Sequence, residues 1–126
     1  MKYLSPEQVL YIHHVLTEVA GFRDPGALES AVARPRSGFG DEEFDETVSE
    51  KAAALLHSLL DNHPFVDGNK RTAITAAGLF LEYKGRAFTA TNEELEQFTR
   101  SVITEDPTVE ETARWIQAHS RRLEEG

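Results

Sequence analysis

The chain has 126 residues, a net charge of −9, 40% hydrophobic residues and 28% charged residues. These values fit one folded domain, residues 1–126, with a real hydrophobic core. Proteins that bind nucleic-acid backbones usually carry a basic face, so the acidic balance argues against direct nucleic-acid binding, including by a helix-turn-helix. The chain has no apolar run of about 18 residues, no signal-peptide pattern and no cysteine, so we expect a cytoplasmic protein without membrane spans, disulfides or thiolate metal sites.

Hydrophobic spacing and capping residues predict helices along most of the chain. Their expected positions, in chain order, are Ser5-Pro6 to Gly21, Asp24-Pro25 to just before Pro35, Thr47 to near Asn62, residues 72–81 with Gly85 beyond them, a helix capped by Thr91, and a helix opened by Asp106-Pro107. The segment 72–81 (TAITAAGLFL) is apolar almost all round, which is typical of a central helix.

Residues 35–45 (PRSGFGDEEFD) have a different composition, with a proline, two glycines and four acids. This stretch is predicted to be a loop or a short hairpin. Residues 86–89 would form at most a brief extended piece. The predicted fold class is therefore all-α, with about six helices and a loop or short hairpin at 35–45 before the two helices that flank the most polar motif.

That motif is HPFVDGNKRTA, residues 63–73, at the entrance to the predicted central helix. Gly68 can adopt a positive φ, and Asn69 tolerates the same kind of turn and can cap a helix. The backbone N–H groups of residues 68–71 would be the unpaired donors of the first turn, which favours a bound anion. A simple surface helix gains from acids there, whereas this chain has Lys70 and Arg71. The pattern indicates a phosphate-binding turn.

Two more side chains predict chemistry beside that phosphate. Asp67 would repel it unless a divalent cation lay between them, and Mg²⁺ is usually held by one or two carboxylates together with phosphate oxygens. His63 precedes the turn, and the usual histidine pKa of about 6.5 suits a general base that accepts a proton from a hydroxyl. These residues together indicate a nucleotide-dependent transferase that acts on a hydroxyl.

The motif resembles the H-x-F-x-[DE]-[GA]-N-[GK]-R signature of the Fic/Doc (Fido) proteins. Lysine at position 70 looks like the death-on-curing (Doc) toxin branch of that family. Residues 28–35 (LESAVARP) are also similar to the segment that precedes the flap in Doc-type chains. Length and helix order are similar too, so the resemblance covers nearly the whole chain.

The resemblance implies a role for each motif residue. His63 would be the base that takes the proton from the target hydroxyl, and Asp67 would hold Mg²⁺. Arg71 would contact the phosphates of ATP, so His63, Asp67 and Arg71 form the implied catalytic set. The implied nucleotide-binding residues are Gly68, Asn69, Lys70 and Arg71.

The resemblance also implies an activity and partners. In Doc, the lysine goes with transfer of the γ-phosphoryl group, so the chain looks like an Mg-ATP-dependent protein kinase toxin of a type II toxin–antitoxin system. The implied substrate is a threonine of elongation factor Tu, whose modification stops translation. The flap at 35–45 would dock a target peptide by strand addition. The implied partner is a Phd-like antitoxin whose C-terminal segment folds onto the toxin.

Two alternatives stay open. Doc-type motifs often have alanine where this chain has Gly68, which is the Fic-like residue, so a Fic-type adenylyltransferase that modifies a Ser, Thr or Tyr hydroxyl is the second interpretation. A binding module without catalysis is the third, and the complete set of motif residues argues against it. The inhibitory pattern [ST]-x-x-x-E-[GN] is not completed at 120–125, because Glu125 stands at its last position. Inhibition by a separate antitoxin is therefore favoured.

Overall fold

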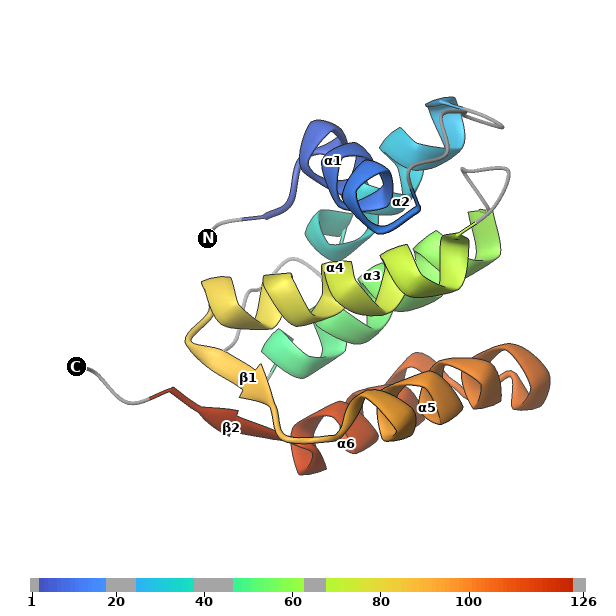
Figure 1. The fold of residues 1–126 in the computed structure, drawn as a ribbon. Helices are drawn as coiled ribbons and strands as arrows, with labels where there is room; N and C mark the ends of the chain where they lie inside the picture. The colour runs from blue at the N-terminus through green and yellow to red at the C-terminus, as the bar shows by residue number, and fades with distance from the viewer. Residues whose placement is uncertain (1–2, 18–24, 38–46, 63–67, 124–126) are drawn as a thin grey trace.

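The computed structural model describes residues 3–17, 25–37, 47–62 and 68–123. In this part of the chain the elements are, in order, α1 (Pro6–Thr17), α2 (Pro25–Ser37), α3 (Thr47–Asn62), α4 (Asn69–Tyr83), β1 (Arg86–Phe88), α5 (Asn92–Glu105), α6 (Val109–Ala118) and β2 (Ser120–Arg122). The helices form three layers, with α3 and α4 between α1/α2 and α5/α6 (Figure 1). The predicted all-α class with about six helices is confirmed.

The middle layer contains most of the hydrophobic core. Small side chains allow neighbouring helices to pack closely. Helix α4 has three that are fully buried, Ala73, Ala76 and Ala77. Farther along α4, Phe80 and Leu81 are fully buried, and each such side chain contributes roughly 1.5–3 kcal/mol. The prediction that this helix lies at the centre of the protein is confirmed.

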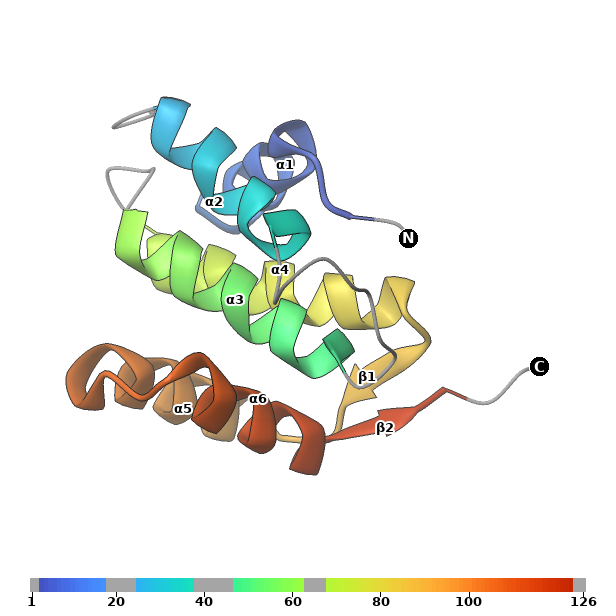
Figure 2. The same cartoon turned by 180° about the vertical axis from the view of Figure 1, so that it is seen from behind.

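Two columns of helices cross the layers. Seen from behind, α2, α3 and α6 form the nearer column, and α1, α4 and α5 form the farther one (Figure 2). A side-chain hydrogen bond joins α1 to α4, since Gln8 Nε2 donates to the Tyr83 hydroxyl over 2.7 Å. Helix α4 therefore has α1 on one side and α5 on the other, and this arrangement defines the surface on which Lys70 and Arg71 lie.

Among the described residues, three helices begin with a reciprocal capping box, in which a hydroxyl accepts from the third helical N–H and that residue's side chain accepts from the cap N–H. The residue pairs are Ser5 with Gln8 in α1, Thr91 with Glu94 in α5, and Thr108 with Glu111 in α6. The predicted caps at Ser5 and Thr91 are confirmed. Such boxes stabilise a helix start by satisfying two donors that have no intrahelical acceptor.

The capping boxes of α5 and α6 make the stability of the fold depend on pH. Hydrogen bonds from the backbone N–H and the hydroxyl of Thr91 hold the pKa of Glu94 below its usual value of 4.5, and Thr108 lowers the pKa of Glu111 in the same way. A carboxyl with a lowered folded-state pKa stabilises the fold fully above its unfolded value. That contribution disappears as the pH falls through the lowered folded value. We therefore predict that the melting temperature falls on acidification below pH 4.5.

The double variant Glu94→Gln/Glu111→Gln is expected to show a smaller fall over the same range, because its caps no longer titrate. Thermal unfolding followed by circular dichroism from about pH 2 to pH 7 measures the effect. Glu93→Gln/Glu110→Gln is the matched control, since these first-turn acids do not make the capping-box bonds. If the melting temperature of the double variant fell with pH as steeply as that of the wild type, these two carboxyls would not be the source of the pH dependence.

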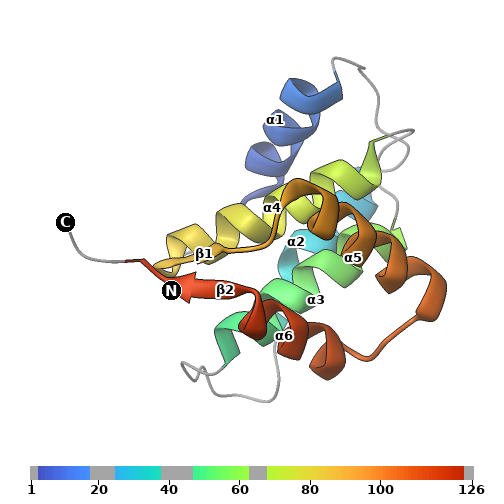
Figure 3. The ribbon, with the colours of Figure 1, turned by 60° about the horizontal axis from the view of Figure 1, so that its bottom comes forward.

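The C-terminal end of α4 leads into a small sheet. Gly85 adopts φ 78°, and its N–H donates to the Glu82 carbonyl over 3.0 Å, which confirms the predicted stop. Strand β1 then pairs with β2 in antiparallel register, with Arg86 opposite Arg122 and Phe88 opposite Ser120. Figure 3 shows this sheet at the end of α4 that is remote from the motif.

Two predicted boundaries are wrong at or near prolines. Helix α2 does not stop before Pro35 but continues to Ser37, so residues 35–37 are helical and not part of a loop. Proline removes one backbone hydrogen bond, and here the loss falls in the last turn of a helix whose buried face (Leu28, Ala31, Val32) packs on α3. The rest of the predicted loop, residues 38–45, lies outside the described residues.

The second boundary is the start of α6. It is capped by Thr108, and Asp106-Pro107 precedes it; Asp106 itself adopts φ 48° and ends α5. The strand β2 was also not predicted, although the extended piece at 86–88 was. None of the described helices has the length and apolar character that a membrane span requires.

Candidate functional site

The first turn of α4 is built around a glycine. Gly68 precedes the helix with φ 79° and ψ 14°, and its carbonyl accepts the N–H of Thr72 over 3.0 Å. This left-handed conformation favours glycine, because a Cβ would crowd the backbone. The predicted positive φ at Gly68 is confirmed, whereas Asn69 is the first helical residue and not the cap.

This helix start differs from those of α1, α5 and α6. Its cap makes no side-chain hydrogen bond, and its first turn holds no acid, whereas the other three have capping boxes and at least one acid each. Lys70 and Arg71 occupy that turn instead, both exposed and neither paired with a carboxylate among the described residues. Each cation there is disfavoured by about 0.3–1 kcal/mol by the helix dipole. A bound anion would reverse that penalty.

The turn opens onto a groove along α4, between α1 and α5. Its volume is about 930 Å³. The apolar part of its lining comes from all three helices, as Ile12 and Leu16 of α1, Ile74 and Leu79 of α4, and Leu95 of α5. The charged part is Lys70 and Arg71 at the start of α4, Glu82 near its end, and Glu96 and Arg100 on α5. The groove therefore joins the cationic turn to a long apolar surface.

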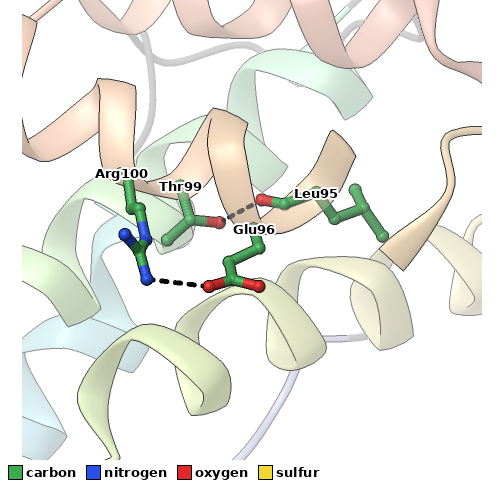
Figure 4. A network of polar contacts seen from close by, with 4 residues as sticks. All are labelled: Leu95, Glu96, Thr99 and Arg100. Atoms are coloured by element: carbon green, nitrogen blue, oxygen red, sulfur yellow. Dashed lines mark hydrogen bonds and ion pairs between the residues drawn. The ribbon is translucent and has the colours of Figure 1, made fainter. Parts of the chain in front are cut away.

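The α5 side of the groove is held by local contacts. Arg100 Nη2 bridges Glu96 Oε1 over 2.9 Å, and the Thr99 hydroxyl donates to the Leu95 carbonyl over 2.8 Å (Figure 4). Arg100 thus has a carboxylate partner, unlike Arg71 across the groove. The sequence reasoning did not identify Glu96 or Arg100 as groove residues. Their i,i+4 spacing predicts the ion pair, but only the packing of α5 beside α4 places it here.

The predicted site residues divide into two groups. Gly68, Asn69, Lys70 and Arg71 are brought together on one turn, as expected. The proposed base His63 and the proposed metal ligand Asp67 lie outside the described residues, so their positions remain predictions. In the described part of the chain, no group of three His, Asp or Glu side chains is arranged to hold a metal ion.

The four histidines outside the motif lie in the described part of the chain. His57 Nε2 lies 2.8 Å from the Thr112 hydroxyl, and His119 stacks on Trp115 with ring centroids 3.9 Å apart. His13 is buried and His14 is exposed. None of these contacts resembles an activated catalytic histidine, which leaves His63 as the candidate base.

The donor set suits a phosphorylated nucleotide. A glycine-capped turn without an acid, carrying two cations that have no ion-pair partner among the described residues, fits phosphate oxygens. Mg²⁺ typically keeps several water ligands and needs only one or two carboxylates beside phosphate oxygens, so Asp67, which precedes this turn in the sequence, would suffice as the protein ligand. The fold and the turn thus define a helical domain with a cationic, glycine-capped turn at the start of its central helix.

Comparison with known proteins identifies the class. A family model described as the Fic/DOC family matches residues 3–81. The chain is 51% identical over 63 residues to a protein named Toxin Doc from Mycolicibacterium smegmatis; this covers 50% of this chain and 48% of that protein. It is 33% identical over 89 residues to the Protein kinase doc of Escherichia phage P1, covering 68% of this chain and 70% of that protein.

The chain belongs to the Fic/DOC family, and these relatives support its Doc branch. The matched segment spans about half the length of the M. smegmatis toxin. The family match includes α1 to α3, α4 up to Leu81 and the whole motif, and therefore the glycine-capped turn itself.

Proposed function

We propose that this protein is the toxin of a type II toxin–antitoxin system, and that it transfers the γ-phosphoryl group of ATP to a hydroxyl of a translation factor. The observation that carries this proposal is the start of α4. Its glycine cap, its lack of an acid, and Lys70 and Arg71, which have no ion-pair partner in the described part of the chain, favour phosphate. Relatives named as a toxin Doc and a protein kinase doc support the same activity.

In the proposed reaction, the oxygen of the target hydroxyl forms a bond to the γ-phosphorus as His63 takes the hydroxyl proton. The bond from the γ-phosphorus to the bridging oxygen breaks, and ADP leaves with that oxygen. Arg71 would bind phosphate oxygens and stabilise the charge that develops on them. Asp67 would hold Mg²⁺, which when bound neutralises phosphate charge.

Lys70 and Gly68 point to different members of the family. Lys70 adds bulk and charge to the anion-binding turn and resembles the Doc branch, which favours γ-phosphoryl transfer. Gly68 is the Fic-like residue, and its φ of 79° is a conformation that an alanine would adopt with strain. Transfer of the adenylyl group to a Ser, Thr or Tyr hydroxyl is therefore the second candidate. We favour phosphorylation because Lys70 stands where adenylyl-transferring Fic proteins look to have a glycine.

The proposed substrate is a threonine of elongation factor Tu, by resemblance to Doc. The test is whether the protein stops translation in cells. Induction of the wild type is expected to stop incorporation of labelled amino acids, and His63→Ala is expected to leave incorporation unchanged. Continued incorporation with folded, soluble wild-type protein would contradict the proposed role as a toxin of translation.

A Phd-like antitoxin is the proposed partner, and the groove along α4 is its proposed seat. The apolar lining from Ile12, Leu16 and Leu79 fits the apolar face of an amphipathic helix, which is how disordered segments commonly dock. Lys70 and Arg71 lie in the same groove, so a segment seated there would cover the cationic turn. Docking and inhibition would then be one event.

This seat predicts a separation of toxicity from neutralisation. Leu95→Glu places a charge in the groove at a side chain that is only partly buried, and it is expected to weaken antitoxin binding by at least about tenfold while toxicity remains. Ile103→Glu is the matched control on the same helix, because Ile103 is exposed and does not line the groove. Growth on co-expression with the antitoxin is the measurement. Equal neutralisation of both variants would exclude this seat.

A further inference from the structure

One buried hydroxyl, that of Thr72, differs from the others in its hydrogen bonding. Ser49 donates to Gln117, Thr99 donates to the Leu95 carbonyl, and Thr112 lies 2.8 Å from His57 Nε2. Thr72 Oγ1 is the only buried side-chain nitrogen or oxygen in the described part of the chain without a hydrogen-bond partner, and the residue is 1% exposed. Such groups are rare in native proteins and call for an explanation.

Thr72 lies one turn inside α4, directly after Arg71. Its N–H already donates to the Gly68 carbonyl over 3.0 Å. Because Cα–Cβ bonds in a helix tilt toward the N-terminus, the Thr72 side chain leans back over the turn that begins at Gly68. Two exceptions therefore coincide at one place: the helix start without a side-chain cap, and the buried hydroxyl without a partner. Departures of this kind are expected at functional sites and not in a core optimised for stability.

An acceptor for this hydroxyl is available in the same turn. A helical threonine can rotate about χ1 to donate to the carbonyl four residues earlier. Thr99 makes this bond to Leu95 over 2.8 Å, as Figure 4 shows, and Thr104 makes it to the Arg100 carbonyl over 3.1 Å. For Thr72 the equivalent acceptor is the Gly68 carbonyl. The Gly68 carbonyl would then accept two hydrogen bonds from Thr72, one from its backbone N–H and one from its hydroxyl.

We propose that Thr72 is a positioning residue of the phosphate-binding turn, and that its hydroxyl closes on the Gly68 carbonyl when phosphate fills the turn. The inference rests on the proposed nucleotide-binding function. Thr72 does not touch the phosphate. It fixes the cap so that the N–H groups of the first turn stay directed at the bound oxygens.

The experiment compares Thr72→Val, which keeps the shape and loses the hydroxyl, with Thr72→Ser, which keeps the hydroxyl. Melting temperature is measured without ligand, and calorimetry gives the Kd for Mg²⁺ with a non-hydrolysable ATP analogue. Thr72→Val is expected to melt at or above the wild-type temperature, since an unpaired hydroxyl is removed, and to bind the analogue about 2- to 10-fold more weakly. Thr72→Ser is expected to bind within about twofold of wild type.

Thr112→Val is the matched control, because Thr112 is equally buried and its hydroxyl is paired with His57. It should lower the melting temperature by about 3–6 °C and leave the Kd unchanged. A Thr72→Val protein that melts well below wild type, or that binds the analogue as tightly, would overturn the inference alone. If the wild type shows no binding of the analogue, the proposed function fails and this inference fails with it.

Discussion

Replacing His63 by alanine is expected to lower kcat for transfer by about 10²- to 10⁴-fold, the range typical of a lost general base. The reason is that the target hydroxyl keeps its proton at neutral pH unless a neighbouring group accepts it. Transfer to elongation factor Tu, measured with saturating Mg-ATP, gives the effect directly. The wild type should also lose activity at acidic pH as the base becomes protonated, and the variant should lack that dependence.

His14→Ala is the matched control, since His14 is an exposed histidine on α1. It should transfer at the wild-type rate and keep the acidic limb of the pH profile. A His63→Ala protein that melts like wild type and retains full activity would remove the general base from the account. The noncatalytic binding module would then be the better interpretation.

Replacing Arg71 by alanine is expected to lower kcat/KM by about 10²- to 10³-fold, as found when one preorganised donor to transition-state charge is removed. The fold should be unaffected, because Arg71 is exposed and has no ion-pair partner among the described residues. Steady-state kinetics separates two outcomes. A loss in kcat shows stabilisation of the transition state, whereas a rise in KM alone shows uniform binding of the phosphates.

Arg100→Ala tests whether any cation in the groove has this effect. Arg100 lies in the same groove and is paired with Glu96 at the surface, so its removal should change stability by at most about 1 kcal/mol and activity little. An equal loss of activity in the Arg71 and Arg100 variants would mean that the groove acts through its general field, and that the first turn of α4 has no special role.

Much of the fold was predictable because its signals are local. The pattern of a hydroxyl followed three residues later by Glu or Gln located the starts of α1 and α5, and the apolar segment 72–81 identified the central helix. The same pattern at Thr108 and Glu111 was present in the sequence, and it located α6 better than Asp106-Pro107 did. A capping box satisfies two donors, whereas proline only permits a helix to begin.

Other features depend on contacts between distant segments. Lys51 reads as a surface residue of an amphipathic helix, yet it is 2% exposed, because α2, α4 and α6 all pack on α3. Its ammonium lies 3.2 Å from the Tyr3 hydroxyl. Strand β2, with its Ser-Arg-Arg sequence, has no alternating pattern and forms only because β1 provides the partner. Helix α2 continues through Pro35, where its sequence predicts an end, because its buried face packs on α3.

The site follows the same division. The composition of the motif predicted the glycine conformation and the cationic turn, because both are properties of consecutive residues. The groove required the packing of α1, α4 and α5, which no local pattern encodes. The buried, unpaired hydroxyl of Thr72 could likewise be seen only in the folded chain. The positions of His63 and Asp67 relative to Arg71 stay predictions.

The most direct measurement is transfer of label from ATP. The purified protein is incubated with Mg²⁺ and elongation factor Tu, with ATP labelled either at the γ- or at the α-phosphate, and with His63→Ala as the control. The account predicts label from the γ position alone, lost in the variant. Label from the α position would contradict it, and would show that a chain with Lys70 in this turn transfers the adenylyl group.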